Sequence, residues 1–188
     1  MLRTACLQAK TWRDRGVQLP RIGVNVSAKQ FYQQNFPLVV EQVLADTQLE
    51  AAILEIEITE SLLMENTDRA IDTMHALRRL GVQIALDDFG TGYSSLSRLK
   101  EFPIDCLKID HSFVRDISTD VNDQAIASAV LAMAGSLNMR VVAEGVETSD
   151  QFDFLKLKEC NEMQGYLICR PLPADKLEEF LLQLPAGE

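Results

Sequence analysis

The stretch VQIALD at residues 82–87 decides the fold, because it is typical of a buried strand that ends on an acid. Its aliphatic side chains take alternate positions: Val82, Ile84 and Leu86. Side chains alternate between the two faces of a strand, so Asp87 at its carboxyl end points away from that aliphatic face. A helical pattern at about 67–80, ended by Gly81, precedes the strand. Together they predict one helix–strand repeat of an α/β fold.

The same repeat extends along the chain in both directions. Strands are predicted at 22–27, 53–59, 82–87, 104–109, 140–144 and 163–168. Helices are predicted at about 2–15, 38–48, 67–80, 122–138, 149–158 and 174–184, with a short helix in or after the Gly-rich stretch that follows Asp87. Strands separated by helices indicate a parallel sheet. No G-x-G-x-x-G follows the first strand, which favours a (β/α) barrel over an open doubly wound sheet.

Polar residues stand at the end of each predicted strand, where a barrel carries its functional groups. In chain order they are Asn25, Glu57, Asp87 with Asp88, Lys108 with Asp110, Glu144, and Gln164 within the last strand. One polar strand end is usually a turn signal, but six in succession indicate a site. Histidine and cysteine motifs for zinc are absent from the sequence, so a metal here would have oxygen ligands, as Mg²⁺, Mn²⁺ and Ca²⁺ prefer.

Length, composition and charge exclude several classes of protein. The chain has 188 residues, of which 47% are hydrophobic, so one domain with a substantial core is expected. Twenty-eight acids against 18 bases give a net charge of −10, which argues against binding to DNA or to a membrane surface. No apolar run approaches the roughly 20 residues that cross a bilayer. The four cysteines form no C-x-x-C pair and are expected to be buried thiols in a cytoplasmic protein.

The length is short for a complete barrel. Eight units usually take roughly 250 residues, and six strands are predicted here. Because the chain opens on a helix, the deficit lies at the N-terminus. The strands at 22–26 and 163–168 are therefore expected to expose their edges, a liability for aggregation or swapping.

Six short motifs carry a resemblance to a known family. They are VNVSAKQF at 24–31, LEIEITES at 54–61, DDFGTGYSSL at 87–96, LKID at 107–110, AEGVET at 143–148 and QGYL at 164–167. In this order they resemble the EAL domain family of cyclic di-GMP phosphodiesterases. The chain, residues 1–188, is similar to a single EAL-type domain fragment, the C-terminal three quarters of a (β/α)8 TIM-barrel-like fold. The string Glu-Ala-Leu itself does not occur, so the resemblance implies an N-terminally truncated domain.

The resemblance implies a role for each site residue. Asn25, Glu57 and Asp87 match ligands of one divalent ion, and Asp88 and Glu147 match positions associated with the second ion or its bound water. Lys108 matches the lysine that holds the attacking water, and Glu144 a general base or metal-organising residue. The supporting positions are Asp110 and Gln164. Glu60 matches the residue that anchors the DFGTGYSS loop, which in this family links the metal site to dimerisation. A metal-ligating glutamate and a phosphate-binding arginine of the family would precede Met1.

The implied activity is hydrolysis of cyclic di-GMP to linear pGpG in bacterial second-messenger signalling, with two ions, Mg²⁺ or Mn²⁺. Two metals supply both needs of an in-line displacement, a nucleophilic water and a neutralised oxyanion. They would also offset the mutual repulsion of six carboxylates, about 4 kcal/mol for one pair about 4 Å apart at a dielectric of about 20. The resemblance further implies a homodimer and, upstream in a longer parent, a GGDEF or sensory domain that could tether it to a membrane.

Other interpretations stay open at this point. The chain could be a catalytically inactive module that binds cyclic di-GMP or a protein partner, or a remnant that does not fold alone. Locally, Gly90 and Gly92 could serve only a tight turn with Ser94 or Ser95 as a helix cap. Glu147 could be a helix-start acid.

Overall fold

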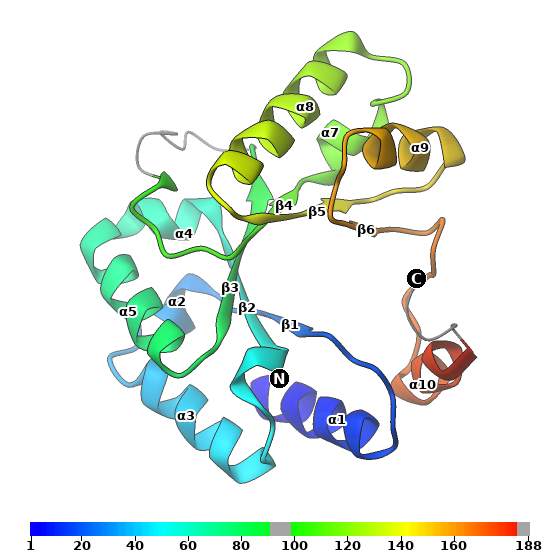
Figure 1. The fold of residues 1–188 in the computed structure, drawn as a ribbon. Helices are drawn as coiled ribbons and strands as arrows, with labels where there is room; N and C mark the ends of the chain where they lie inside the picture. Colours follow the sequence, from blue (N-terminus) through cyan, green and yellow to red (C-terminus); the bar gives the residue numbers. More distant parts are fainter. Residues whose placement is uncertain (91–98, 184–188) are drawn as a thin grey trace.

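A computed structural model describes residues 1–90 and 99–183. The described residues hold one parallel sheet in the order β1-β2-β3-β4-β5-β6, so each strand pairs with the next along the chain (Figure 1). The strands are β1 (Ile22–Asn25), β2 (Leu54–Thr59), β3 (Gln83–Phe89), β4 (Cys106–Ile109), β5 (Arg140–Glu144) and β6 (Glu162–Gln164). This sequential order confirms the barrel-type arrangement, with about six of the eight strands, and excludes the doubly wound alternative.

Helices surround the curved sheet. The longer ones are α1 (Leu2–Asp14), α3 (Phe36–Thr47), α5 (Thr67–Arg79), α8 (Val121–Ser136), α9 (Ser149–Leu157) and α10 (Ala174–Gln183). Short helices lie directly after strands: α2 (Ala28–Phe31), α4 (Glu60–Glu65) and α7 (His111–Arg115), and a 3-10 turn spans Ala51–Ile53. None of the described helices is both long and apolar enough to cross a membrane.

The alternation read from the sequence sets the two faces of the sheet. One face packs on the helices in a core that includes Ile56, Ile84, Leu86, Leu107 and Val141. The other face is layered. At its carboxyl end stand the charged residues described below, and in its middle lies a small apolar cluster of Ala85, Cys106 and Val142.

A second ionic network closes the amino end of that inner face. The Arg140 guanidinium pairs with Glu55, donates to Gln83 Oε1 at 2.9 Å and pairs with Glu162 at 3.0 Å. Glu55 is only 6% exposed, so water contributes little to its solvation and the ion pair with Arg140 compensates its charge. Glu55 lies near the amino end of β2, at the opposite end of the sheet from the site at the carboxyl ends of the strands.

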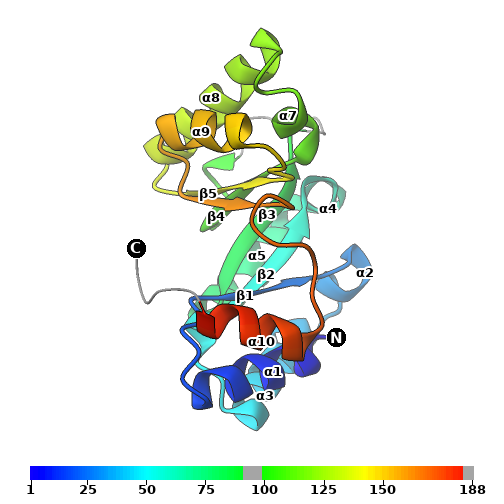
Figure 2. The same cartoon turned by 90° about the vertical axis from the view of Figure 1, so that its right-hand side faces the viewer.

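The edges of the sheet are β1 and β6, which in the part of the chain described here pair only with β2 and β5. Ionic contacts cross the interval between them. Arg21, just before β1, pairs with Glu162 on β6, and Arg15 at the end of α1 pairs with Glu178 on α10 at 3.0 Å. Figure 2 shows α10 lying beside α1, so the chain after β6 returns to the N-terminal side.

Most predicted elements lie within two residues of the observed ones, and the differences have local causes. The predicted strand 163–168 ends at Gln164, because the chain turns there: the amides of Ile168 and Cys169 both donate to the Gly165 carbonyl. The helices α2, α4 and α7 were not predicted, because each is too short to show a helical period in the sequence. The expected short helix with a cap at Ser94 or Ser95 falls on residues 91–98, outside the described residues.

Candidate functional site

A buried ammonium group stands at the centre of the site. Lys108 on β4 is 6% exposed, and its Nζ lies 2.9 Å from Glu57 Oε2, 3.1 Å from Asp87 Oδ1 and 2.8 Å from Glu144 Oε1. These partners come from β2, β3 and β5, so strands on both sides of β4 contribute. The alternation of side chains places all four on the inner face at the carboxyl ends of their strands, as the sequence predicts.

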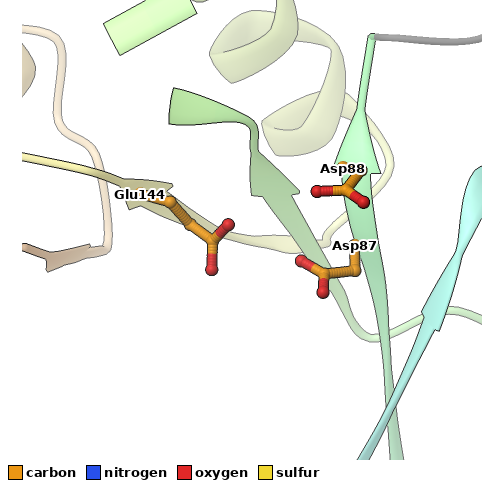
Figure 3. A group of neighbouring side chains, drawn as sticks. All are labelled: Asp87, Asp88 and Glu144. Carbon is orange, nitrogen blue, oxygen red and sulfur yellow. The ribbon is translucent and has the colours of Figure 1, made fainter. Parts of the chain in front are cut away.

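A kink at the end of β3 brings a second carboxylate to the same place. Asp88 has φ +54°, a left-handed conformation that Asp tolerates better than most residues, and the pairing of β3 with β4 shifts between Leu86 and Phe89. The kink breaks the strict alternation after Asp87. Oxygens of Asp87, Asp88 and Glu144 consequently lie within 4.8 Å of one another, and Figure 3 shows the three carboxylates directed into one space.

The charges of this group depend on one another. Burial disfavours the charged form of Lys108, but its hydrogen bonds to Glu144 and Glu57 outweigh that and hold its pKa above the ordinary lysine value. Burial raises the pKa of Glu144, against the opposing effect of Lys108. The pKa of Asp88 is also raised, by burial and then by the carboxylates of Asp87 and Asp110. The raised pKa values of Glu144 and Asp88 show that a further positive charge beside them would stabilise their anionic forms.

The site's geometry also depends on a glycine that is not among the predicted site residues. Gly23 on β1 lies under the Glu57 side chain: a Cβ built there would stand 1.9 Å from Glu57 Oε1. Only a residue without a side chain lets Glu57 occupy its position beside Lys108. A glycine inside a strand often marks such a close approach, and that signal could have identified it.

The neighbouring helix α7 brings Asp110 to the site. The Asp110 carboxylate caps α7 by accepting from the Ser112 amide at 3.0 Å, and its second oxygen lies 3.3 Å from His111 Nδ1. Burial opposes its ionisation, but the hydrogen bonds from Ser112 lower its pKa overall. Asp110 therefore stays an anion, and its charge acts on Asp88.

The remaining predicted residues stand around this centre. Asn25 pairs in register with Glu57, and Gln164 with Glu144, so both lie at the carboxyl ends of the edge strands. Glu147 is exposed, in the turn after β5 directly before the Thr148 cap of α9, and its carboxylate lies outside the group formed by Asp87, Asp88 and Glu144.

Glu60 lies apart from the cluster and contacts the start of the Gly-rich loop. It is 3% exposed, and its Oε2 accepts from the Gly90 amide at 3.3 Å. Most of the DFGTGYSS sequence, residues 91–95, lies outside the described residues. The bond from Gly90 to Glu60 therefore describes only how this loop begins.

The donor set suits a hard divalent cation. Asp87 Oδ1 is buried and accepts no hydrogen bond within the described part of the chain, although Lys108 Nζ is 3.1 Å away. Carboxylate oxygens from Asp87, Asp88 and Glu144 converge without a histidine or cysteine among them. Oxygen-only ligation is typical of Mg²⁺, Mn²⁺ and Ca²⁺ sites.

Known proteins are similar to this chain in sequence and in fold. The cyclic di-GMP phosphodiesterase NbdA of Pseudomonas aeruginosa is 45% identical over 96% of this chain. The solved PaMucR phosphodiesterase, a c-di-GMP complex, superposes with a TM-score of 0.90 at 43% identity, covering 94% of this chain and 71% of that one. Klebsiella pneumoniae BlrP1, solved as a manganese/cyclic di-GMP complex, gives 0.80 at 30% identity, covering 90% of this chain and 44% of its own.

These likenesses concern one part of larger proteins, since the chain spans about a quarter of the length of the curated relatives, 23% in the case of NbdA. The family model of the EAL domain matches residues 1–171, which include every site residue discussed above. The chain belongs to the EAL domain family.

Proposed function

We propose that this chain hydrolyses cyclic di-GMP to linear pGpG with the help of two divalent ions, Mg²⁺ or Mn²⁺. The observation that carries the proposal is the convergence of Glu57, Asp87 and Glu144 on Lys108, with Asp88 beside them, at the carboxyl end of an EAL-domain sheet. It is supported by relatives and structures whose names include cyclic di-GMP phosphodiesterase and the cyclic di-GMP ligand.

The proposed roles are those that membership of the EAL domain family implies for these positions. Asn25, Glu57 and Asp87 would hold one ion, and Asp88 with Glu147 the second, while Asp110 supports Asp88. When bound, such ions lower the pKa of water and neutralise charge on a phosphoryl oxygen. Gln164, in register with Glu144, would line the site.

The chemical step is the displacement of one ester oxygen at phosphorus. A water oxygen forms the new bond to phosphorus, one bridging P–O bond breaks, and the leaving ester oxygen takes up a proton and becomes a hydroxyl group. Lys108, which stays positively charged, would hold and orient the attacking water. Glu144, with its raised pKa, would accept the proton that the water gives up.

Further proposals concern the setting of this single EAL-type domain. We expect a homodimer formed through the DFGTGYSS loop, anchored by Glu60, and a GGDEF or sensory domain upstream in the parent protein. A cytoplasmic location is supported by four free cysteines, of which Cys6 and Cys106 are buried.

The test is incubation of the purified chain with cyclic di-GMP and Mg²⁺ or Mn²⁺, followed by chromatography. Formation of pGpG by the wild-type chain, abolished by Glu57→Gln and retained by the exposed control Glu65→Gln, is the expected result. A folded wild-type chain that binds cyclic di-GMP without forming pGpG would instead identify a binding module and refute the proposed hydrolysis.

A further inference from the structure

A buried glutamine joins two loops at the rim of the site. Gln151, in the first turn of α9, is 4% exposed. Its Oε1 accepts from the amides of Glu147 at 2.7 Å and Thr148 at 2.9 Å, and its Nε2 donates to the Arg115 carbonyl at 2.9 Å. The amide side chain thus spans from the turn after β5 to the end of α7.

Helix capping explains only part of this arrangement. In a capping box the third residue of the helix bonds back to the N-cap amide, which accounts for the contact between Gln151 and Thr148. The bonds to Glu147 and to Arg115 lie outside the box. A glutamine that served α9 alone would need neither of them.

The two segments that Gln151 joins also touch each other directly. Gly145, with φ +73°, lies against α7 so closely that a Cβ there would stand 2.7 Å from His111 Cβ. The turn after β5 and the start of α7 are therefore in contact at one end, and Gln151 connects them at the other, through the Arg115 carbonyl.

The opposite side of the turn is held by the chain after β6. The Val146 amide donates to the Gln164 carbonyl, and the Leu167 amide donates to the Val146 carbonyl, both at 3.0 Å. Gly165 lies so close that a Cβ would come within 2.1 Å of the Val146 oxygen. The turn that carries Glu147 is thus fixed between α7 and β6, and Gln151 is the side chain that completes this support.

We propose that Gln151 is a positioning residue for the second cation of the site, because it sets the distance between the Glu147 turn and the helix that begins after Asp110. The inference rests on the proposed function, in which Asp88 and Glu147 hold that cation and Asp110 supports Asp88. Partners that orient metal ligands from outside typically contribute 10- to 100-fold to metal affinity or activity, on the order of the effect expected here.

Two variants distinguish the bonds of Gln151 to the turn after β5 from its bond to the end of α7. Gln151→Met has a similar length and removes all three side-chain bonds. Gln151→Glu retains an acceptor for the Glu147 and Thr148 amides but loses the donor to the Arg115 carbonyl. The control is Asp120→Ala, which removes the exposed cap of α8, where Asp120 accepts from the Asn122 amide at 2.7 Å, and so lowers stability without contacting the site.

The experiment measures Mn²⁺ binding by calorimetry and the Mn²⁺ dependence of cyclic di-GMP hydrolysis, each beside urea unfolding. We expect Gln151→Met to weaken binding at one of the two sites about tenfold or more, Gln151→Glu to give a smaller loss, and Asp120→Ala to bind as the wild type does. If Gln151→Met does not fold, Gln151→Glu carries the test alone.

Unchanged Mn²⁺ affinity in a folded Gln151 variant, beside a wild-type chain that binds and hydrolyses, would overturn the positioning role alone. An equal loss in Asp120→Ala would also overturn it, because the effect would then follow stability. A wild-type chain that neither binds Mn²⁺ nor hydrolyses cyclic di-GMP would refute the proposed function and, with it, this inference.

Discussion

The clearest perturbation of the site is Gly23→Ala, because the added methyl group meets one side chain. The new Cβ would lie 1.9 Å from Glu57 Oε1, and the nearest distance that real Cβ atoms show is about 3.0 Å, so the carboxylate must move by about 1.1 Å. That oxygen belongs to the flexible end of a side chain, so the strand itself is not displaced. A shift of about 1 Å in a catalytic group can reduce the rate about 100-fold, or about 2.7 kcal/mol.

The assay compares kcat/KM for cyclic di-GMP hydrolysis and the midpoint of urea unfolding in Gly23→Ala and in a matched control. Gly135→Ala in α8 is that control, because a Cβ there meets nothing within 4 Å and alanine favours the helix by about 1 kcal/mol. We expect Gly23→Ala to lose about 100-fold in kcat/KM with a midpoint close to that of the wild type. Full activity in a folded Gly23→Ala chain would refute the positioning of Glu57 beside Lys108 as a requirement of the site.

Other predictions concern the buried charges. Lys108→Met should lower the unfolding free energy of the metal-free chain by about 3–5 kcal/mol, because three carboxylates lose their buried counter-charge. Added Mn²⁺ should restore part of the lost stability. Equal urea midpoints of variant and wild type would contradict this prediction. Arg140→Met should lower the unfolding free energy by up to about 3 kcal/mol, since it leaves Glu55 buried without its partner. The kcat/KM of the folded fraction should stay unchanged. A loss of kcat/KM would contradict this and show that the two ends of the barrel are coupled. Burial raises the pKa of the Cys106 thiol from 9.0 to about 12. As the pH rises, the thiol therefore loses its proton in the unfolded chain before it does in the folded chain. Deprotonation stabilises the unfolded chain, so the unfolding free energy falls between pH 9.0 and about 12. Cys106→Ala should flatten the slope by up to about 1.4 kcal/mol per pH unit, and parallel slopes in urea unfolding below and above pH 9.0 would disprove the assignment.

The strands of this fold are well predicted from the sequence, because the alternation of apolar residues and the polar residues at the strand ends indicate the same elements and the same faces. In β3 the alternation of Ile84 and Leu86 fixes which face is buried, and the parallel arrangement then places Asp87 beside residues from β2 and β5. The order of the strands follows from the alternation with helices, which leaves each strand next to its successor. These are local rules, so they can be applied without coordinates.

Other features arise from tertiary contacts that have no local signature. The shift of register after Leu86 and the left-handed Asp88 bring a second carboxylate into the cluster, although strict alternation would turn it away. The bond of Gln151 to the Arg115 carbonyl joins residues 36 apart in the chain. Only its capping-box half, Thr148 with Gln151, could have been recognised from the spacing of residue types.

The strand order has a consequence for how this sheet is made. Among the described strands, every pairing joins a strand to the one that follows it in the chain, so none of them needs a partner from a distant part of the sequence. During synthesis a domain's N-terminal part leaves the ribosome first, and here each newly emerged strand finds its neighbour already present. The sheet can therefore grow in one direction, from β1 to β6, in step with translation.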